Sequence, residues 1–178
     1  PGKLYEVVYT AVGGPLVGLG LATARDAASF LRYATAEAGN PAASGLDFAY
    51  AFGASQSGRF LRQLLYLGLC EDEEGRLTFD GIHAHIAGAR FVEANYRFAQ
   101  PGYLGPYSPI NLFPFTDALQ TEPTTGRADG VQRRSVARGV VPKVIYTNSS
   151  FEYWGSQAAL VHTALDGKTD ARGPDNVR

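Results

Sequence analysis

The chain has 178 residues, a length that fits one domain of ordinary size. Its 16 lysines and arginines against 17 aspartates and glutamates give a formal net charge of -1, which creates no field for gathering phosphates and argues against a nucleic-acid partner. The 45% hydrophobic content supports a packed core, and no apolar run is long enough to span a membrane. The single cysteine, Cys70, excludes an internal disulfide and a cysteine-based zinc site.

The first predicted elements are a strand and a helix. β-branched and aromatic residues at 4–10 predict a strand, which the glycines and proline at 13–15 end. Apolar residues at helical spacing predict a helix over residues 21–36, which Gly39 and Pro41 terminate.

A second strand and helix come next. The continuous apolar run at 48–52 predicts a strand that is covered on both faces. A helix comes almost without a loop, and Gly68 suits its end. The acidic stretch at 71–75 is most simply a solvated turn. The predicted buried stripe of this helix is Phe60, Leu61, Leu64 and Leu65.

Two more strands, at residues 82–87 and 144–147, and a last helix at 154–165 complete the alternation. This order predicts a mostly parallel sheet with helices on both faces. The aromatic, Pro- and Gly-rich segment at 98–141 is expected to be a lid over one end of the sheet, with an excursion away from the body as the alternative. The sheet itself is then divided between residues 1–97 and 142–178.

The joint between the second predicted strand and its helix has the sequence GASQSGR and the setting of a nucleophile elbow. The elbow serine sits on a tight, strained turn, so the residues two before and two after it must be small. Ser55 has Gly53 and Ser57 at these positions, whereas Ser57 has Arg59. Ser55 is therefore the predicted nucleophile.

An elbow also supplies a hydrogen-bond donor to the oxyanion. The backbone N–H of Gln56, at the start of the helix, is the predicted donor. The strict G-x-S-x-G string is not met, because Ser57 replaces its second glycine. In the alternative interpretation, Ser55 merely caps the helix.

A serine nucleophile needs a base and an acid that orients the base, and on this kind of fold the chain order is serine, acid, histidine. Glu152 is the only carboxylate in the loop after the strand at 144–147, so it is the predicted acid. The alternative role for Glu152 is a charge favoured by the N-terminus of a helix.

Each of the three histidines is a poor match for the role of the catalytic base. His83 and His85 come before the lid and in the wrong order, and a metal site built on them lacks a third histidine or a nearby carboxylate. His162 follows Glu152 but lies two to three turns into the last predicted helix, where packing is its expected role and that of the base is the alternative. We therefore expect the base after Arg178, beyond a strand that residues 176–178 begin.

Several segments resemble a bacterial family that is named for its alpha/beta hydrolase domain. The likeness covers nearly the whole chain, and its more specific parts are SQSGR at 55–59 and EYWG at 152–155. It implies an α/β-hydrolase fold, with Ser55 matching the nucleophile and Glu152 the acid, but implies no particular substrate. The Gly58-Arg59 pair is also similar to the elbow of tannase-like and feruloyl-esterase-like enzymes. Other matching segments are those at 4–10, 18–22, 25–26, 60–62, 113–117 and 125–127.

The sequence lacks the upstream oxyanion loop and the downstream histidine of a complete family member. With Pro1 at its start and no methionine, it is expected to be a fragment cut at both ends, inactive by itself and of undetermined compartment. The predicted reaction is cleavage of an acyl bond in a small molecule, most simply an ester, because an alkoxide leaves with less help than an amine. No metal or organic cofactor is predicted, and the carboxylates at 117–129 lack the spacing of a calcium loop.

Two other functions are considered. A dinucleotide-binding module would use GLGLAT at residues 18–23, but Thr23 stands where glycine or alanine is expected, and Asp47 begins the second strand instead of ending it. A non-catalytic binding protein with the hydrolase fold is the second alternative, against which the small residues around Ser55 argue.

Overall fold

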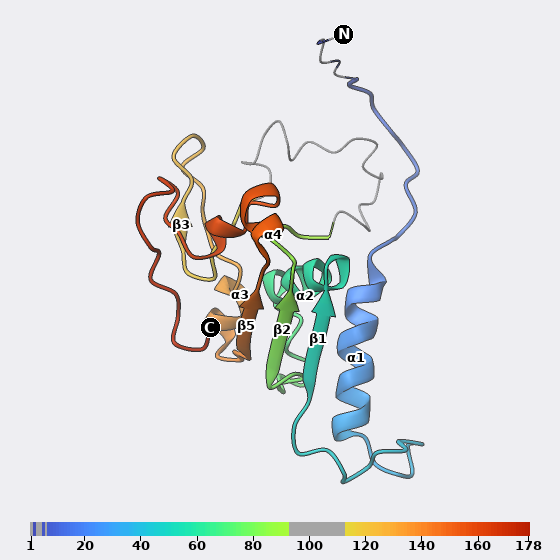
Figure 1. The fold of residues 1–178 in the computed structure, drawn as a ribbon. Helices are drawn as coiled ribbons and strands as arrows, with labels where there is room; N and C mark the ends of the chain where they lie inside the picture. Colours follow the sequence, from blue (N-terminus) through green and yellow to red (C-terminus); the bar gives the residue numbers. More distant parts are fainter. Residues whose placement is uncertain (1, 3–4, 6, 93–112) are drawn as a thin grey trace.

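Three parallel strands form the centre of the molecule (Figure 1). The computed structural model describes residues 2, 5, 7–92 and 113–178. The strands are β1 (Tyr50–Ala54), β2 (Gly81–His85) and β5 (Lys143–Thr147), in the spatial order β1-β2-β5.

The register of this sheet aligns the carboxyl ends of its strands. Ala54 is opposite His85, and His85 is opposite Thr147. The chain's last residues extend the sheet, because Val177 pairs in parallel with Val144 on the free edge of β5. Residues 176–178 therefore pair with β5 through backbone hydrogen bonds, whereas the strand expected to begin there stays a prediction. The segments that leave β1, β2 and β5 meet at one end of the sheet, the end formed by the carboxyl ends of the strands. Ligands bind at this end in open α/β folds.

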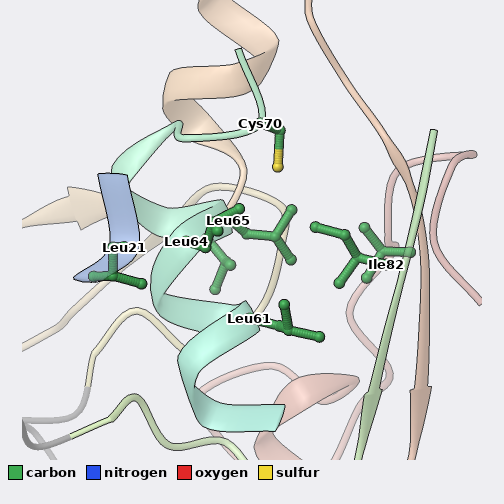
Figure 2. Close-up of a cluster of buried hydrophobic side chains, with 8 residues drawn as sticks. Leu21, Leu61, Leu64, Leu65, Cys70 and Ile82 are labelled. Atoms are coloured by element: carbon green, nitrogen blue, oxygen red, sulfur yellow. The ribbon is translucent and has the colours of Figure 1, made fainter. Parts of the chain in front are cut away.

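One face of the sheet is covered by α2 (Gln56–Leu67), which comes directly after β1 and packs on β1 and β2. Gly68 ends this helix with a φ of 72°, as predicted, because a residue without a side chain adopts the left-handed conformation at low cost. The predicted stripe faces inward, with Leu64 and Leu65 fully buried (Figure 2). The core around it consists of Leu21, Leu61, Leu64, Leu65, Cys70, Ile82, Val131 and Val144.

The helix α1 (Leu19–Tyr33) begins and ends earlier than its apolar pattern predicts. Asn40 is the cause of the early end, because its side-chain amide donates hydrogen bonds to the carbonyl oxygens of Phe30, Leu31 and Ala34. The Phe30 carbonyl oxygen also accepts the Ala34 N–H at 3.0 Å, so the Asn40 amide adds a second donor there. The amide also supplies a donor to the Leu31 and Ala34 carbonyl oxygens at the end of the helix.

The strand predicted at residues 4–10 is wrong for the described part of that segment. Residues 5 and 7–18 have no regular secondary structure, and Figure 1 shows this segment running away from the sheet. Val7 and Val8 are more than 80% exposed. High β-propensity does not make a strand without a neighbouring strand to pair with.

The opposite face of the sheet is open among the described residues. Tyr50, Phe52 and Ile145 are exposed there, so the prediction that β1 is covered on both faces is wrong for this part of the chain. A continuous apolar run indicates that a strand is hydrophobic on both sides, but it does not identify the segment that covers each side.

Part of the predicted lid, residues 98–112, lies outside the described residues. The rest contains β3 (Gln120–Thr121), β4 (Ala128–Asp129) and α3 (Arg133–Arg138). Of these elements, α3 packs beside α2, where the Arg134 guanidinium donates to the Tyr66 carbonyl oxygen at 2.6 Å. The function of this segment as a lid stays a prediction.

The last predicted helix, at 154–165, is wrong in extent. The structure has a short α4 (Ser150–Gly155) and a separate 3-10 helix, η2 (Ala158–Val161). Gln157 separates them with a φ of 57°, a left-handed conformation that stops helical propagation. His162 therefore comes after η2 and does not lie within an α-helix.

The acidic turn at 71–75 is only partly solvated. Asp72 is buried and accepts hydrogen bonds from the Ser29 hydroxyl and the Arg76 guanidinium, at 2.7 and 2.8 Å. Burial favours the neutral acid, but these hydrogen bonds and the charge of Arg76 outweigh burial and lower the pKa of Asp72 to about 2. Asp72 thus attaches the turn to α1.

Candidate active site

Ser55 lies between the end of β1 and the start of α2 in a strained backbone conformation. Its φ of 56° and ψ of -118° are unfavourable for a residue with a side chain. The Ser55 N–H donates to the His85 carbonyl oxygen at 2.9 Å, and the Ser55 carbonyl oxygen accepts from the Arg59 N–H at 3.0 Å. The side chain is exposed and makes no capping hydrogen bond to α2, so the alternative that Ser55 serves as a helix cap lacks its defining contact.

The turn around Ser55 is crowded at two glycines. A Cβ on Gly53 would lie 2.5 Å from the Ser57 carbonyl oxygen, and one on Gly58 would lie 2.8 Å from the His85 carbonyl oxygen. The requirement for a small residue before Ser55 therefore holds at Gly53. After Ser55, the residue that must be small is Gly58, because the Ser57 side chain is exposed and does not meet this crowding. Sequence reasoning missed the role of Gly58, which the SQSGR string itself contains.

Gln56 is the first residue of α2, next to Ser55. The first N–H groups of a helix have no carbonyl partner within that helix, and the helix dipole makes this end attractive to negative charge. The role of the Gln56 N–H as oxyanion donor stays a prediction.

Glu152 lies in the first turn of α4, just beyond the carboxyl end of β5. Its Oε2 accepts hydrogen bonds from the Ser149 N–H, at 3.1 Å, and from the Ser149 hydroxyl. The Ser149 hydroxyl is the main reason that the pKa of Glu152 is lowered, and the charge of His85 adds a smaller effect. The carboxylate is thus ionised and held in a capping box, with both of these bonds on one oxygen.

His83 and His85 project from the same face of β2, as their spacing predicts. One ring nitrogen of each lies 2.8 Å from the hydroxyl oxygen of Thr147. No group of three or more potential metal ligands occurs among the residues that the structure describes.

His162 is exposed, and its ring stacks on the Tyr153 ring, with 5.8 Å between the ring centroids. Its Nδ1 is 3.3 Å from an Asp170 carboxylate oxygen, and its Nε2 is 3.2 Å from the Tyr153 hydroxyl. No sequence pattern indicates the contact with Asp170, because it depends on the path of the loop after η2.

A hollow of about 500 Å³ lies beside the end of β5. Its wall includes Asp117, which is buried and accepts from the Gln132 amide and the Tyr146 hydroxyl. Burial raises the pKa of Asp117, although the charge of Arg62 and these hydrogen bonds oppose the rise. The wall does not include Ser55, which lies two strands away, or about 10 Å at the usual strand spacing. The lining includes Asp117, Tyr146, Asn148, Tyr153, His162 and Val177.

The parallel sheet and the strained serine between strand and helix define the architecture of an α/β hydrolase. A family model described as an alpha/beta hydrolase domain matches residues 2–176, and the chain belongs to this family. The predicted fold class is thereby confirmed, and with it the general class of hydrolase. Comparison with curated proteins found no match, and comparison with solved structures found none either.

Two other observations bear on the alternatives. The helix α1 begins within the GLGLAT segment, at Leu19, and the preceding Gly18 has a φ of 95°. No strand precedes the segment among residues 5 and 7–18. The strand–turn–helix context of a dinucleotide fingerprint is therefore missing there. In the described part of the chain, no helix is long and apolar enough to cross a membrane.

Proposed function

We propose that this domain hydrolyses a small-molecule carboxylic ester with Ser55 as the nucleophile. The observation that carries the proposal is the Ser55 backbone, held at a φ of 56° between β1 and α2 while its hydroxyl makes no capping bond. A strained conformation at an exposed serine is retained only when the surrounding structure fixes it, as Gly53 and Gly58 do here.

In the proposed reaction, Ser55 Oγ attacks the acyl carbon and gives its proton to a histidine. The carbonyl oxygen becomes an oxyanion, which the Gln56 N–H stabilises. The C–O bond then breaks, the alkoxide takes the proton from the imidazolium, and an acyl-enzyme remains on Ser55. Water, deprotonated by the same histidine, attacks the acyl-enzyme and releases the acid and free Ser55.

Glu152 is proposed as the acid that orients this histidine. It lies just after β5, at the same sheet edge as Ser55, and is ionised. Both hydrogen bonds from Ser149 are on Oε2, so Oε1 can accept from an imidazole Nδ1–H. The capping box would fix the direction of the carboxylate in addition to closing the helix.

The histidine itself is proposed to come after Arg178. The parallel pairing of Val177 with Val144 supports this placement, because a segment leaving that strand emerges at the edge where Ser55 and Glu152 lie. The order serine, acid, histidine is the order of triads on this fold.

Labelling of the full-length protein with a fluorophosphonate, which modifies activated serines, tests the nucleophile. Ser55→Ala is expected to abolish labelling, whereas the matched Ser57→Ala variant, two residues away, keeps most of it. Labelling that survives Ser55→Ala and disappears with Ser57→Ala would overturn the assignment. Wild-type protein that is not labelled at all and hydrolyses no ester would overturn the proposed activity.

A further inference from the structure

We propose that the turn at residues 86–88, directly after β2, holds the Ser55 elbow and the Glu152 segment in a fixed relation. Asn148 and Gly88 act as positioning residues through this turn. The inference rests on the proposed function, and its evidence is a continuous series of contacts that starts at Ser55 and ends at Glu152.

The first contacts join the turn to the elbow. The carbonyl oxygen of His85, which leads into the turn, accepts the Ser55 N–H at 2.9 Å. Gly58, in the first turn of α2, faces the same carbonyl oxygen, and a Cβ there would also lie 3.1 Å from the Ala87 Cβ. The turn therefore supports Ser55 directly and leaves α2 no room to approach it more closely.

The next contacts join the turn to the end of β5. The Ile86 N–H donates to the Thr147 carbonyl oxygen at 2.6 Å. The Gly88 N–H donates to the side-chain oxygen of Asn148 at 2.9 Å. Asn148 is the residue that leads from β5 toward Glu152, so its side chain attaches the turn to the start of the acid-bearing segment.

The last contacts reach α4 at its other end. The Ala89 N–H donates to the Ser156 carbonyl oxygen at 3.1 Å, and the Ser156 N–H donates to the Glu152 carbonyl oxygen at 2.9 Å. The segment that carries Glu152 is thus held from the turn on both sides, at Asn148 and at Ser156.

The backbone of the turn is unfavourable by itself. Ile86 has a φ of 46°, which is rare for a β-branched residue, and Gly88 has a φ of 64°. A Cβ on Gly88 would lie 2.4 Å from the Ser156 carbonyl oxygen. Such conformations persist when surrounding contacts determine them, and they gather at functional sites. Here those contacts come from the elbow on one side and the acid-bearing segment on the other.

This arrangement predicts that loosening the turn lowers the turnover rate more than it lowers substrate binding. A displacement of about 1 Å between catalytic groups can cost about 100-fold in rate. Asn148→Ala removes the acceptor for the Gly88 N–H, whereas Asn148→Asp keeps an oxygen at the same reach. Gly88→Ala pushes the Ser156 carbonyl, and with it the end of α4.

Two variants control for general destabilisation. Asn40→Ala removes a buried asparagine that makes more hydrogen bonds than Asn148, far along the chain from the site. Gly139→Ala places a side chain at a φ of 74° with nothing within 4 Å, so it matches the backbone strain of Gly88→Ala without the collision.

The experiment measures kcat and KM for a chromogenic ester, the rate of fluorophosphonate labelling and the melting temperature of the full-length protein. Asn148→Ala and Gly88→Ala are expected to lower kcat and the labelling rate by about 10- to 100-fold, with little change in KM. Asn148→Asp is expected to retain most of the rate, and Asn40→Ala and Gly139→Ala to lower only the melting temperature.

Wild-type kcat in Asn148→Ala and Gly88→Ala, with Ser55 still the labelled residue, would overturn the inference alone. Losses in the two control variants equal to those in the site variants would overturn it as well. Labelling on a residue other than Ser55 would instead overturn the proposed function.

Discussion

Gly53→Ala tests most sharply whether the backbone geometry around Ser55 is required for activity. The new Cβ would lie 2.5 Å from the Ser57 carbonyl oxygen, and contacts shorter than 3.0 Å are essentially never seen. The elbow must therefore move by at least about 0.5 Å, and the atoms it meets are backbone, which cannot rotate away. Overpacking of this kind costs about 1–3 kcal/mol in the free energy of unfolding. The shift of Ser55 relative to its partners is expected to lower kcat about 10- to 100-fold.

Denaturant unfolding measures the loss of stability in this variant, and steady-state ester hydrolysis measures the loss of rate. Gly20→Ala is the matched control, because nothing lies within 4 Å of its Cβ position in α1. There the same substitution is expected to stabilise the protein by about 0.5–1 kcal/mol and leave kcat unchanged. A Gly53→Ala protein with wild-type stability and wild-type kcat would refute the crowding argument.

Three further outcomes are expected. Glu152→Gln is expected to keep the capping box, because glutamine also fits that position, and to lower kcat by about 10²- to 10⁴-fold with little change in KM. Near-full activity of this variant would mean that Glu152 is only a charge at a helix end. The His162→Ala variant is expected to keep most of the wild-type kcat. An inactive variant would mean that His162, next to Asp170, is the catalytic base. Asp72→Asn is expected to reduce the free energy of unfolding by about 2 kcal/mol above pH 4, because the pKa of Asp72 falls from its ordinary 3.8 to about 2 on folding. The difference in stability between wild type and variant shrinks as the pH falls from 4 toward 2, because the carboxylate becomes protonated in the folded state as well as in the unfolded state. Urea midpoints of the two proteins that differ by the same amount at pH 7 and at pH 2 would contradict this prediction.

The elements that could be predicted from the sequence are those whose pattern is local and whose partner lies close in the chain. The leucine stripe of α2 and the glycine that ends it are both set within one helix, and the structure confirms them. Ser55 is placed at a strand–helix joint by its immediate neighbours, without knowledge of the rest of the fold.

The elements that could not be predicted depend on contacts far along the chain. The strand at 4–10 fails because its β-propensity has no paired neighbour among the described residues. The end of α1 is set by the Asn40 amide, and the break after α4 by the left-handed Gln157, neither of which a hydrophobic pattern records. For the same reason, the series of contacts from Ser55 through Gly88 to Asn148 emerges only when three strand ends are brought together.

The measurement that tests the central claim most directly is the location of a covalent adduct on the full-length protein. After fluorophosphonate treatment, cleavage at Arg32 and Arg59 releases a peptide of residues 33–59 that contains both Ser55 and Ser57. The peptide also contains Ser44, and its fragmentation in a mass spectrometer distinguishes the three serines. The proposed mechanism predicts one adduct, on Ser55. An adduct on Ser44, on Ser57 or on a serine outside this peptide would contradict it.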